Sequence, residues 1–184
     1  MGPETSTHVG NTPAQFELRP FSPPDYGAVR ELFIRVNREL APQRLRDAFE
    51  KYIEISLAEE IDRIPDYYDQ TRQRSFWVAY EGERLLGFFG LEPANDRDIE
   101  LRRMYVDPSF RRRGVARRML TLAENIAKRQ GFEAIVLSTS EIQRAALSLY
   151  CNSDYVLVRE ESAVSTSNKT VGGGIRRFHF RKQL

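Results

Sequence analysis

Apolar residues recur along the chain at two spacings, and each spacing predicts a different secondary structure. Steps of three and four predict a helix whose apolar face is Val29, Leu32, Phe33, Val36 and Leu40. Asp25 precedes this face and is expected to cap the helix. The same steps continue from Leu45 to Ile64, so a second helix is expected there, ending at Pro65.

Strand composition appears on both sides of residues 81–84, whose sequence EGER is typical of a hairpin turn. Gly82 is expected to take a positive φ in that turn. Further strands are expected at 16–19, 98–107, 134–140, 155–160 and 175–184, and further helices at 115–127 and 141–151. The order β-α-α-β-β-β-α-β-α-β-β predicts a mixed α/β (α+β) domain built around one sheet.

The chain has 184 residues, a length that suits one domain with a sizeable core. Residues 1–14 are polar and rich in Gly, Pro, Thr and Ser, so a disordered N-terminal tail is expected there. Residues 15–184 are expected to form the single folded domain.

The overall charge is nearly balanced, with 28 Lys and Arg against 26 Asp and Glu, which implies no global attraction to nucleic acid. Seven basic residues are nevertheless clustered in one short region: Arg102, Arg103, Arg111, Arg112, Arg113, Arg117 and Arg118. Cys151 is the only cysteine, which excludes an internal disulfide and a cysteine-based zinc site and favours a reducing compartment. The sequence has neither an apolar segment of bilayer length nor the apolar core of a signal peptide. It therefore predicts a soluble cytoplasmic protein with no membrane partner.

The stretch VDPSFRRRGVARRML, residues 106–120, places three arginines and a glycine where a helix is expected to begin. Backbone N–H groups are unpaired at a helix N-terminus, and cations are unfavourable there unless an anion binds. Gly114 and the small Ala116 would let the backbone approach such an anion closely. The glycine-rich motifs of P-loop and dinucleotide-binding folds are both missing from the sequence. The stretch therefore predicts a site for a phosphate compound that is bound in some other way.

The same stretch resembles the signature V-x-P-x-x-[RQ]-x-x-G-x-[GA] of the GNAT superfamily of acetyl-CoA-dependent N-acetyltransferases, with Val106, Pro108, Arg111, Gly114 and Ala116. A second GNAT element, a helix ending in A-x-x-x-Y before a turn and an aromatic residue, resembles AALSLYCNSDY, with Ala146, Tyr150 and Tyr155. The string STSEIQRAALSLY is similar to the camello branch, with Gln143 where Asn is more frequent. Asp154 replaces the usual Gly before the last aromatic residue, but Asp enters the left-handed region at modest cost.

The resemblance implies a GNAT-like fold for roughly residues 16–183, with a mixed, mostly antiparallel sheet of six to seven strands flanked by about four helices. It implies acetyl-CoA as cosubstrate and no metal. The pantetheine amides would pair, at a splay between two parallel strands, with the backbone of Met104, Tyr105 and Val106. The pyrophosphate would lie on the turn formed by Arg111, Arg112, Arg113, Gly114, Val115 and Ala116. The ribose phosphate would be reached by Arg112, Arg113 or Arg117, and the cofactor-side residues would also include Gln143 and Tyr150.

The resemblance also implies direct attack of a primary amine on the acetyl group in a ternary complex. An aliphatic amine with a pKa of about 10.4 is mostly protonated at neutral pH, so a base is needed. Glu100, six residues before Val106, matches the position where several GNAT members keep a glutamate base that often acts through water. An equally supported interpretation is a surface carboxylate paired with an arginine on the neighbouring strand. Strand alternation would place on one face, unless a bulge intervenes, Glu100, Arg102, Met104 and Val106.

Tyr150 is expected to protonate the departing CoA thiolate, whereas without the motif it would be a partly buried aromatic of an amphipathic helix. An acyl-enzyme route through Cys151 lacks a base, because the only histidines are His8 in the tail and His179 in a strand. The same two distant histidines argue against a catalytic metal.

No motif identifies the amine acceptor, which can be a small molecule or a peptide. One acidic and aromatic segment could receive a cationic amine, although it is more typical of a solvated helix end: Asp62, Asp66, Tyr67, Tyr68 and Asp69. The glycine-rich loop 162–174 is suited to a flexible lid on the acceptor side. The protein can be a monomer or a homodimer. A non-catalytic acyl-CoA sensor and a nucleic-acid-binding module remain as alternative functions.

Overall fold

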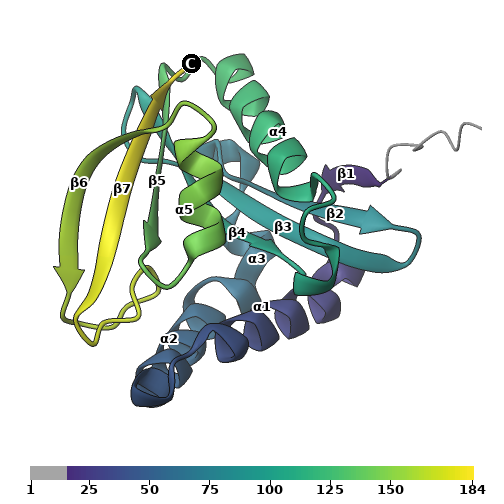
Figure 1. Cartoon of the computed structure of the whole chain (residues 1–184). Coiled ribbons are helices and arrows are strands. Elements are labelled where there is room, and N and C mark those ends of the chain that lie inside the picture. Colours follow the sequence, from purple (N-terminus) through teal and green to yellow (C-terminus); the bar gives the residue numbers. More distant parts are fainter. Residues whose placement is uncertain (1–15) are drawn as a thin grey trace, which may run out of the picture.

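One seven-stranded sheet runs through the computed structural model, which describes residues 16–184 (Figure 1). The expected tail, residues 1–14, lies outside the described residues. The strands are β1 (Glu17–Pro20), β2 (Ser75–Glu81), β3 (Arg84–Pro93), β4 (Asp98–Val106), β5 (Ala134–Ser140), β6 (Val156–Ala163) and β7 (Ile175–Gln183). Their order in the sheet is β1-β2-β3-β4-β5-β7-β6, and every neighbouring pair is antiparallel except β4–β5. The expected mixed and mostly antiparallel sheet is confirmed.

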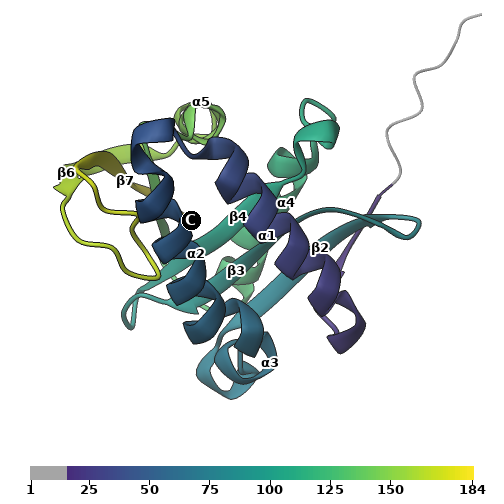
Figure 2. The same cartoon turned by 90° about the horizontal axis from the view of Figure 1, so that it is seen from below.

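Helices cover both faces of the sheet. The helices of one face are α1 (Tyr26–Leu40), α2 (Arg46–Glu59) and the one-turn α3 (Ile64–Tyr67), which Figure 2 shows nearest the viewer. The helices of the other face are α4 (Val115–Arg129) and α5 (Arg144–Cys151). Each face has its own apolar core, with Phe33 and Phe88 fully buried under α1 and Met119 and Ile135 fully buried under α4.

Three features at the ends of helices differ from the sequence prediction. Helix α5 begins at Arg144 rather than at residue 141, because the backbone of Gln143 is not helical, with a ψ of 57°. The second helix ends at Glu59 rather than at Pro65, because the backbone of Glu60 leaves the helix with a φ of −141°. Pro65 instead lies in the first turn of α3, where its missing N–H is tolerated. Asp25 precedes α1 as expected, but its side chain accepts hydrogen bonds from Arg19 and Ser22 and none from the first turn of α1.

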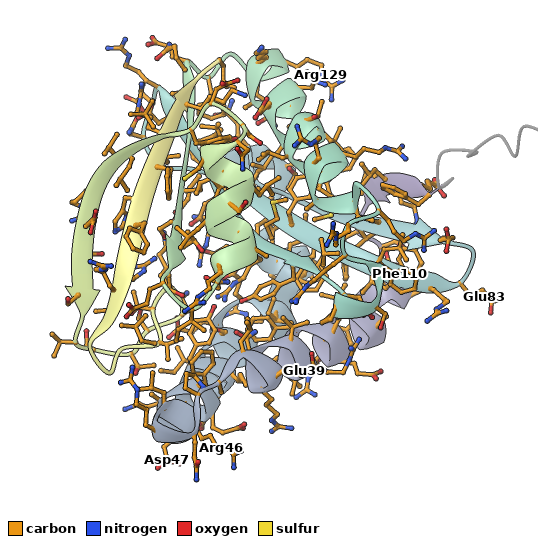
Figure 3. The ribbon with its side chains drawn as sticks, in the orientation of Figure 1. Glu39, Arg46, Asp47, Glu83, Phe110 and Arg129 are labelled. Atoms are coloured by element: carbon orange, nitrogen blue, oxygen red, sulfur yellow. The ribbon has the colours of Figure 1, made fainter. Side chains whose placement is uncertain are left out.

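The predicted hairpin between β2 and β3 is present. Gly82 has a φ of +59°, as the two-residue turn requires. Glu83, the other turn residue, is at the outer end of the hairpin (Figure 3). Local sequence therefore determines this connection.

A β-bulge interrupts β4 in the middle of the sheet. Phe88 pairs with Tyr105 and Gly90 pairs with Arg102, so two residues of β4 lie opposite Phe89 alone. Arg103, within the bulge, has a φ of +51°. The alternation is therefore reversed, with Arg102 directed towards the α2 side and Met104 packed against the core under α4 and α5. The four residues from Glu100 to Val106 that strict alternation would align do not share one face.

A buried ion cluster ties this bulge to the end of α2. The Glu60 side chain is fully buried, and its Oε2 lies 2.7 Å from Arg102 and 2.8 Å from Arg103. The Tyr68 hydroxyl donates to the other carboxylate oxygen. Burial by itself would raise the pKa of Glu60, but the guanidinium charges of Arg103 and Arg102 outweigh burial and hold that pKa below its usual range. The two arginines thus share a carboxylate that lies just after α2 and more than forty positions earlier in the chain.

We expect Glu60→Gln to lower the free energy of unfolding by about 3 kcal/mol, because it leaves two buried guanidinium groups without their shared carboxylate. Urea unfolding at neutral pH measures this loss, and Glu59→Gln, at the adjacent exposed last residue of α2, is the matched control. A lowered pKa in the folded state means that Glu60 stabilises the fold fully above an unfolded carboxyl pKa of about 4.3 and less as the pH falls below it. The Gln variant should therefore lose less stability than the wild type on acidification, and equal stability of the two variants would refute the role of this cluster.

Candidate active site

The parallel strands β4 and β5 separate along their length. Pairing joins only Asp98–Glu100 to 134–136. Beyond these residues β4 stays on β3 as far as Val106, and β5 stays on β7 as far as Ser140. In the described part of the chain, the facing edges of the two strands have no strand partner across the resulting gap. Backbone N–H and C=O groups on these edges can therefore bond to an extended ligand.

A cleft of about 850 Å³ opens at this gap, within the range of about 300–1,000 Å³ that is common for small-molecule sites. Strand β4 contributes Met104, Tyr105 and Val106, the residues that the sequence placed at a splay. Helix α5 forms a second wall with residues from Arg144 to Tyr150. The turn before α4 contributes Arg111, Arg112, Gly114, Val115, Ala116 and Arg117.

The turn between β4 and α4 has the backbone of an anion site. Arg112 and Gly114 have φ values of +63° and +80°, and Gly114 is the N-cap of the 15-residue helix α4. A Cβ atom on Gly114 would meet nothing within 4 Å, so glycine is favoured here by the backbone conformation and not by lack of space. The first helical turn, from Val115 to Arg117, lines the cleft. Its N–H groups and the helix dipole favour a phosphate at this end of the cleft.

The clustered arginines separate in the structure and do not form one basic patch. Three line the cleft: Arg111, Arg112 and Arg117. Arg113 lies outside the cleft lining and pairs with Glu81 at 2.6 Å. Arg118 lies over the ring of Phe16, and the remaining two belong to the buried ion cluster of the bulge. Of the seven arginines that are clustered in the sequence, three thus contribute positive charge to the cleft.

Tyr150 is placed at the inner end of the cleft. Its ring is buried, and its hydroxyl donates to the Sδ atom of Met104 at 3.8 Å. Burial raises the pKa of Tyr150, so the phenol keeps its proton at neutral pH. The neighbouring Cys151 is exposed and is not part of the cleft lining. An uncharged proton donor, and not a thiol, therefore faces the gap between the strands.

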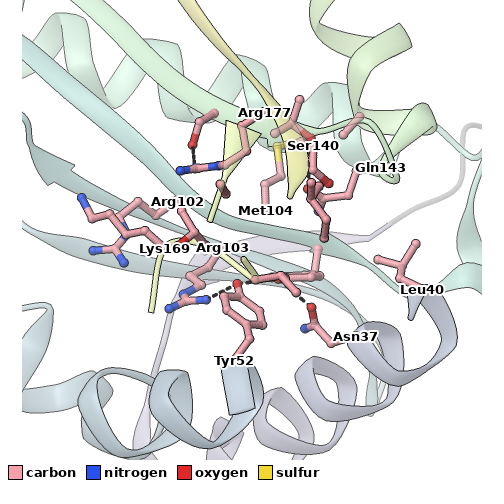
Figure 4. A pocket seen from close by; sticks show the side chains of 18 of the residues that line it. Asn37, Leu40, Tyr52, Arg102, Arg103, Met104, Ser140, Gln143, Lys169 and Arg177 are labelled. Atoms are coloured by element: carbon pink, nitrogen blue, oxygen red, sulfur yellow. Dashed lines mark hydrogen bonds between the residues drawn. The ribbon is translucent and has the colours of Figure 1, made fainter. Parts of the chain in front are cut away.

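A second, smaller cavity of about 120 Å³ lies on the α2 side of β4 (Figure 4). It is bounded by Tyr52 of α2, by Arg177 of β7 and by residues 168–171 of the loop between β6 and β7. The two cavities share Leu40, Met104, Tyr105, Gln143, Ala146 and Tyr150. A ligand in the cleft and a second ligand in this acceptor-side pocket would therefore meet beside Met104 and Tyr150.

Glu100 lines the acceptor-side pocket and forms an ion pair there. Its partner is Lys169 at 2.6 Å, from the loop between β6 and β7, and not an arginine on the neighbouring strand. The interpretation of Glu100 as the partner of an arginine on the neighbouring strand is therefore wrong, because the loop that carries Lys169 lies over β4. The carbonyl oxygen of Asn168 also accepts a hydrogen bond from Arg103 at 2.6 Å. These two contacts hold the loop over the pocket.

Gln143 stands between the two cavities at the start of α5. Its side-chain oxygen accepts hydrogen bonds from the hydroxyls of Thr139 at 3.1 Å and Ser140 at 3.4 Å. Its carbonyl oxygen accepts from the N–H groups of Ala146 and Leu147. The residue thus fixes the end of β5 to the first turn of α5.

The acidic and aromatic segment from Asp62 to Asp69 contributes no residue to either cavity. Tyr67 and Tyr68 donate to Glu92 and Glu60, so they belong to the buried ion cluster and not to a solvated helix end. Two further residues of the pocket, Tyr52 and Arg177, were not expected from the sequence, because no local motif marks them. The packing of α2 and the position of β7 beside β5 bring them to the pocket.

Within residues 16–184, no group of three or more His, Cys, Asp and Glu side chains could hold a metal ion. The Nε2 atom of His179 donates a hydrogen bond to the Glu161 carboxylate at 2.7 Å, and His179 lines neither cavity. None of the helices in this part of the chain has an apolar stretch long enough to cross a bilayer.

Comparison with known families identifies the domain. A family model described as "Acetyltransferase (GNAT) family" matches residues 39–152. "Probable N-acetyltransferase 14" of Xenopus tropicalis is 40% identical over 98 residues, covering 52% of this chain and 47% of the relative. "Probable N-acetyltransferase camello" of the same species is 33% identical over 85 residues, covering 45% and 39%. N-acetylaspartate synthetase of Danio rerio is 29% identical over 140 residues, covering 72% and 50%. The chain thus spans about half the length, or less, of these relatives.

Solved structures share the fold. An acetyltransferase of Salmonella typhimurium, solved with its cofactor acetyl-CoA, has a TM-score of 0.70 at 17% identity and covers 92% of this chain and 94% of its own. The PaiA N-acetyltransferase of Thermoplasma acidophilum, in complex with coenzyme A, has a TM-score of 0.66 at 21% identity and covers 92% and 99%. At such low sequence identities, the similarity to these structures shows a shared fold and nothing further.

Proposed function

Since this chain belongs to the GNAT family of acetyltransferases and is similar to its camello-type members, we propose that it moves the acetyl group of acetyl-CoA to a primary amine. The single observation that carries the proposal is the junction of the two cavities at Met104 and Tyr150. One cavity has the phosphate-binding turn, and the other is open to a second reactant. Such an arrangement suits direct transfer in a ternary complex.

In this proposal acetyl-CoA lies in the cleft. Its pantetheine amides pair with the free backbone edge of β4 at Met104–Val106, and its pyrophosphate lies on the turn from Arg111 to Ala116. Arg112 or Arg117 is the better candidate for the ribose phosphate, because Arg113 already has a carboxylate partner. Gln143 contributes by fixing the adjacent wall.

The reaction needs two proton transfers. The nitrogen of the neutral amine attacks the thioester carbonyl carbon, the carbon–sulfur bond breaks, and the thiolate leaves. Tyr150 protonates that thiolate, since its buried hydroxyl keeps its proton and has only a thioether sulfur as acceptor in the described structure. The amine proton passes to Glu100 through water, because Glu100 lines the pocket from which the amine approaches.

The pair of Glu100 and Lys169 offers a direct test of the base. If Glu100 accepts the proton, Glu100→Gln should lower kcat/KM by about a hundredfold or more. Lys169→Gln breaks the same ion pair but keeps the carboxylate, so it should retain most of the activity. Steady-state CoA release at several pH values measures both variants. Equal losses would show that the ion pair matters for structure only, and would leave water as the base.

The proposed function is tested by a screen of amines for CoA release from acetyl-CoA. Thermal unfolding with acetyl-CoA or duplex DNA accompanies it, because a ligand at about a hundred times its dissociation constant adds roughly 2.7 kcal/mol of stability. Binding of acetyl-CoA with turnover supports the proposal, binding without turnover indicates a sensor, and stabilisation by DNA alone refutes it. The zebrafish relative named N-acetylaspartate synthetase recommends amino acids for the first amines in the screen. The single cysteine favours a cytoplasmic setting for the reaction.

A further inference from the structure

Four cationic side chains line the acceptor-side pocket: Arg102, Arg103, Lys169 and Arg177. The first three have carboxylate oxygens within 2.8 Å, from Glu60, Glu92 and Glu100. The opposite charges within these pairs largely cancel. Arg177 has no carboxylate oxygen at such a short distance. The net charge of the pocket therefore depends on what compensates the charge of Arg177.

Arg177 is a mostly buried guanidinium group without a hydrogen-bonded carboxylate in the described structure. Its side chain is 12% exposed, and the nearest carboxylate oxygen, on Glu161, is 3.6 Å away. That oxygen already bonds to His179 at 2.7 Å, and Glu161 also pairs with Arg159 at 3.3 Å. Burial lowers the pKa of Arg177 from its ordinary value, yet an arginine stays protonated at neutral pH. The pocket thus contains a positive charge that its own walls leave incompletely paired.

The one hydrogen bond of the Arg177 side chain among the described residues is donated to the Oγ atom of Ser138. Arginine has five N–H donors in a planar fork, so most of them remain available to a ligand. The hydroxyl proton of Ser138 is also available, because its oxygen acts as the acceptor in this contact. Both side chains line the pocket, and together they provide donors to it. Figure 4 shows the Arg177 side chain there.

Arg177 lies in the same pocket as the residues at which the reaction is proposed to occur. In the sheet Arg177 is paired with Ser140 at the end of β5, where β4 and β5 have separated. Its side chain lines the same pocket as Met104 and Tyr150. A short ligand whose anionic group met Arg177 would therefore direct its other end towards the junction with the cleft.

We propose that Arg177 and Ser138 bind a carboxylate of the acceptor, so that the acceptor is an amine that also carries a carboxylate group. This inference rests on the proposed acetyl transfer and names its substrate class. A carboxylate fits the guanidinium fork in a bidentate manner and neutralises its charge. A neutral or purely cationic amine leaves that mostly buried charge with only its 3.6 Å contact to Glu161, which costs binding free energy. Arg177 thus determines the specificity for the acceptor, while Tyr150 donates and Glu100 accepts a proton.

The test compares the common amino acids other than Asp and Glu with their C-terminal amides, which keep the amine and lose the negative charge. For Asp and Glu, whose side chains keep a carboxylate, the comparison is with the diamides. Two readouts are taken on the full chain: the thermal unfolding midpoint, with and without saturating CoA, and CoA release from acetyl-CoA. At least one acid should raise the midpoint more than its amide does and should be preferred in kcat/KM by roughly ten- to a hundredfold. Arg177→Gln should remove both differences, Arg177→Lys should restore part of the preference, and the KM for acetyl-CoA should stay unchanged.

Arg176→Gln is the matched control, since Arg176 is the adjacent residue of β7, is 57% exposed and lies outside the pocket lining. It should keep the preference for the acid. The inference is overturned if amides bind and react as well as acids, if no acid binds, or if Arg177→Gln keeps the preference. Selective binding of an acid through Arg177 without any CoA release would instead support the anion site and refute the proposed acetyl transfer.

Discussion

Gly114→Glu is expected to weaken acetyl-CoA binding by at least about a hundredfold, as measured by calorimetric titration. A side chain at φ +80° strains the backbone by roughly 1–2 kcal/mol. The new carboxylate also lies at the N-terminus of α4, where the helix dipole attracts it to the N–H groups that a pyrophosphate would use. It therefore competes with the ligand for the site and repels it, while the open space around Gly114 lets the protein stay folded.

Gly131 offers a control at the other end of the same helix. It has a φ of +85°, and a Cβ there also meets nothing within 4 Å. Gly131→Glu should thus impose a similar backbone strain, seen as a lower unfolding midpoint, with no change in acetyl-CoA affinity. Gly114→Ala separates strain from charge and should weaken binding by about tenfold or less. Wild-type affinity in Gly114→Glu would place the phosphate site elsewhere in the molecule.

Tyr150→Phe is expected to lower kcat by roughly ten- to a thousandfold, the scale for loss of one positioned acid. The ring keeps its packing against Tyr155 and Phe180, at centroid distances of 5.7 Å and 6.1 Å, so the cleft should keep its shape. Affinity for acetyl-CoA should change little, because in the proposed mechanism the hydroxyl acts mainly as the thioester opens. Single-turnover kinetics together with equilibrium titration distinguish these two effects.

Tyr155→Phe is the matched control for this experiment. Tyr155 is equally buried, but its hydroxyl donates to Glu124 at 3.2 Å and lies outside both cavities. Its loss should reduce stability by about 1 kcal/mol and leave kcat close to the wild-type value. Full activity in Tyr150→Phe with a good acceptor would exclude Tyr150 from the mechanism, and inactivity of Cys151→Ala would support an acyl-cysteine route instead.

Most of the fold follows from local sequence pattern. The spacing of apolar residues correctly predicted α1, α4 and α5, and alternation with turn residues correctly predicted the hairpin at Gly82. The end of the second helix was predicted wrongly, since apolar periodicity continues to Ile64 although Glu60 has left the helix. Glu60 is buried in the core, where it pairs with two arginines of the distant strand β4. The periodicity of apolar residues along α2 contains no information about such partners.

The candidate site likewise has some features that follow from local sequence and others that depend on tertiary contacts. The sequence by itself determined the position of the turn that we propose as the phosphate site, because a glycine, a helix N-terminus and adjacent arginines are neighbours along the chain. Only the tertiary structure decided which arginines face the cleft, that Lys169 pairs with Glu100, and that Arg177 enters the acceptor-side pocket. These outcomes depend on the bulge in β4 and on the placement of β7 beside β5. Both arise from contacts between residues far apart in sequence, whereas the spacing of residues along one segment reports only the conformation of that segment.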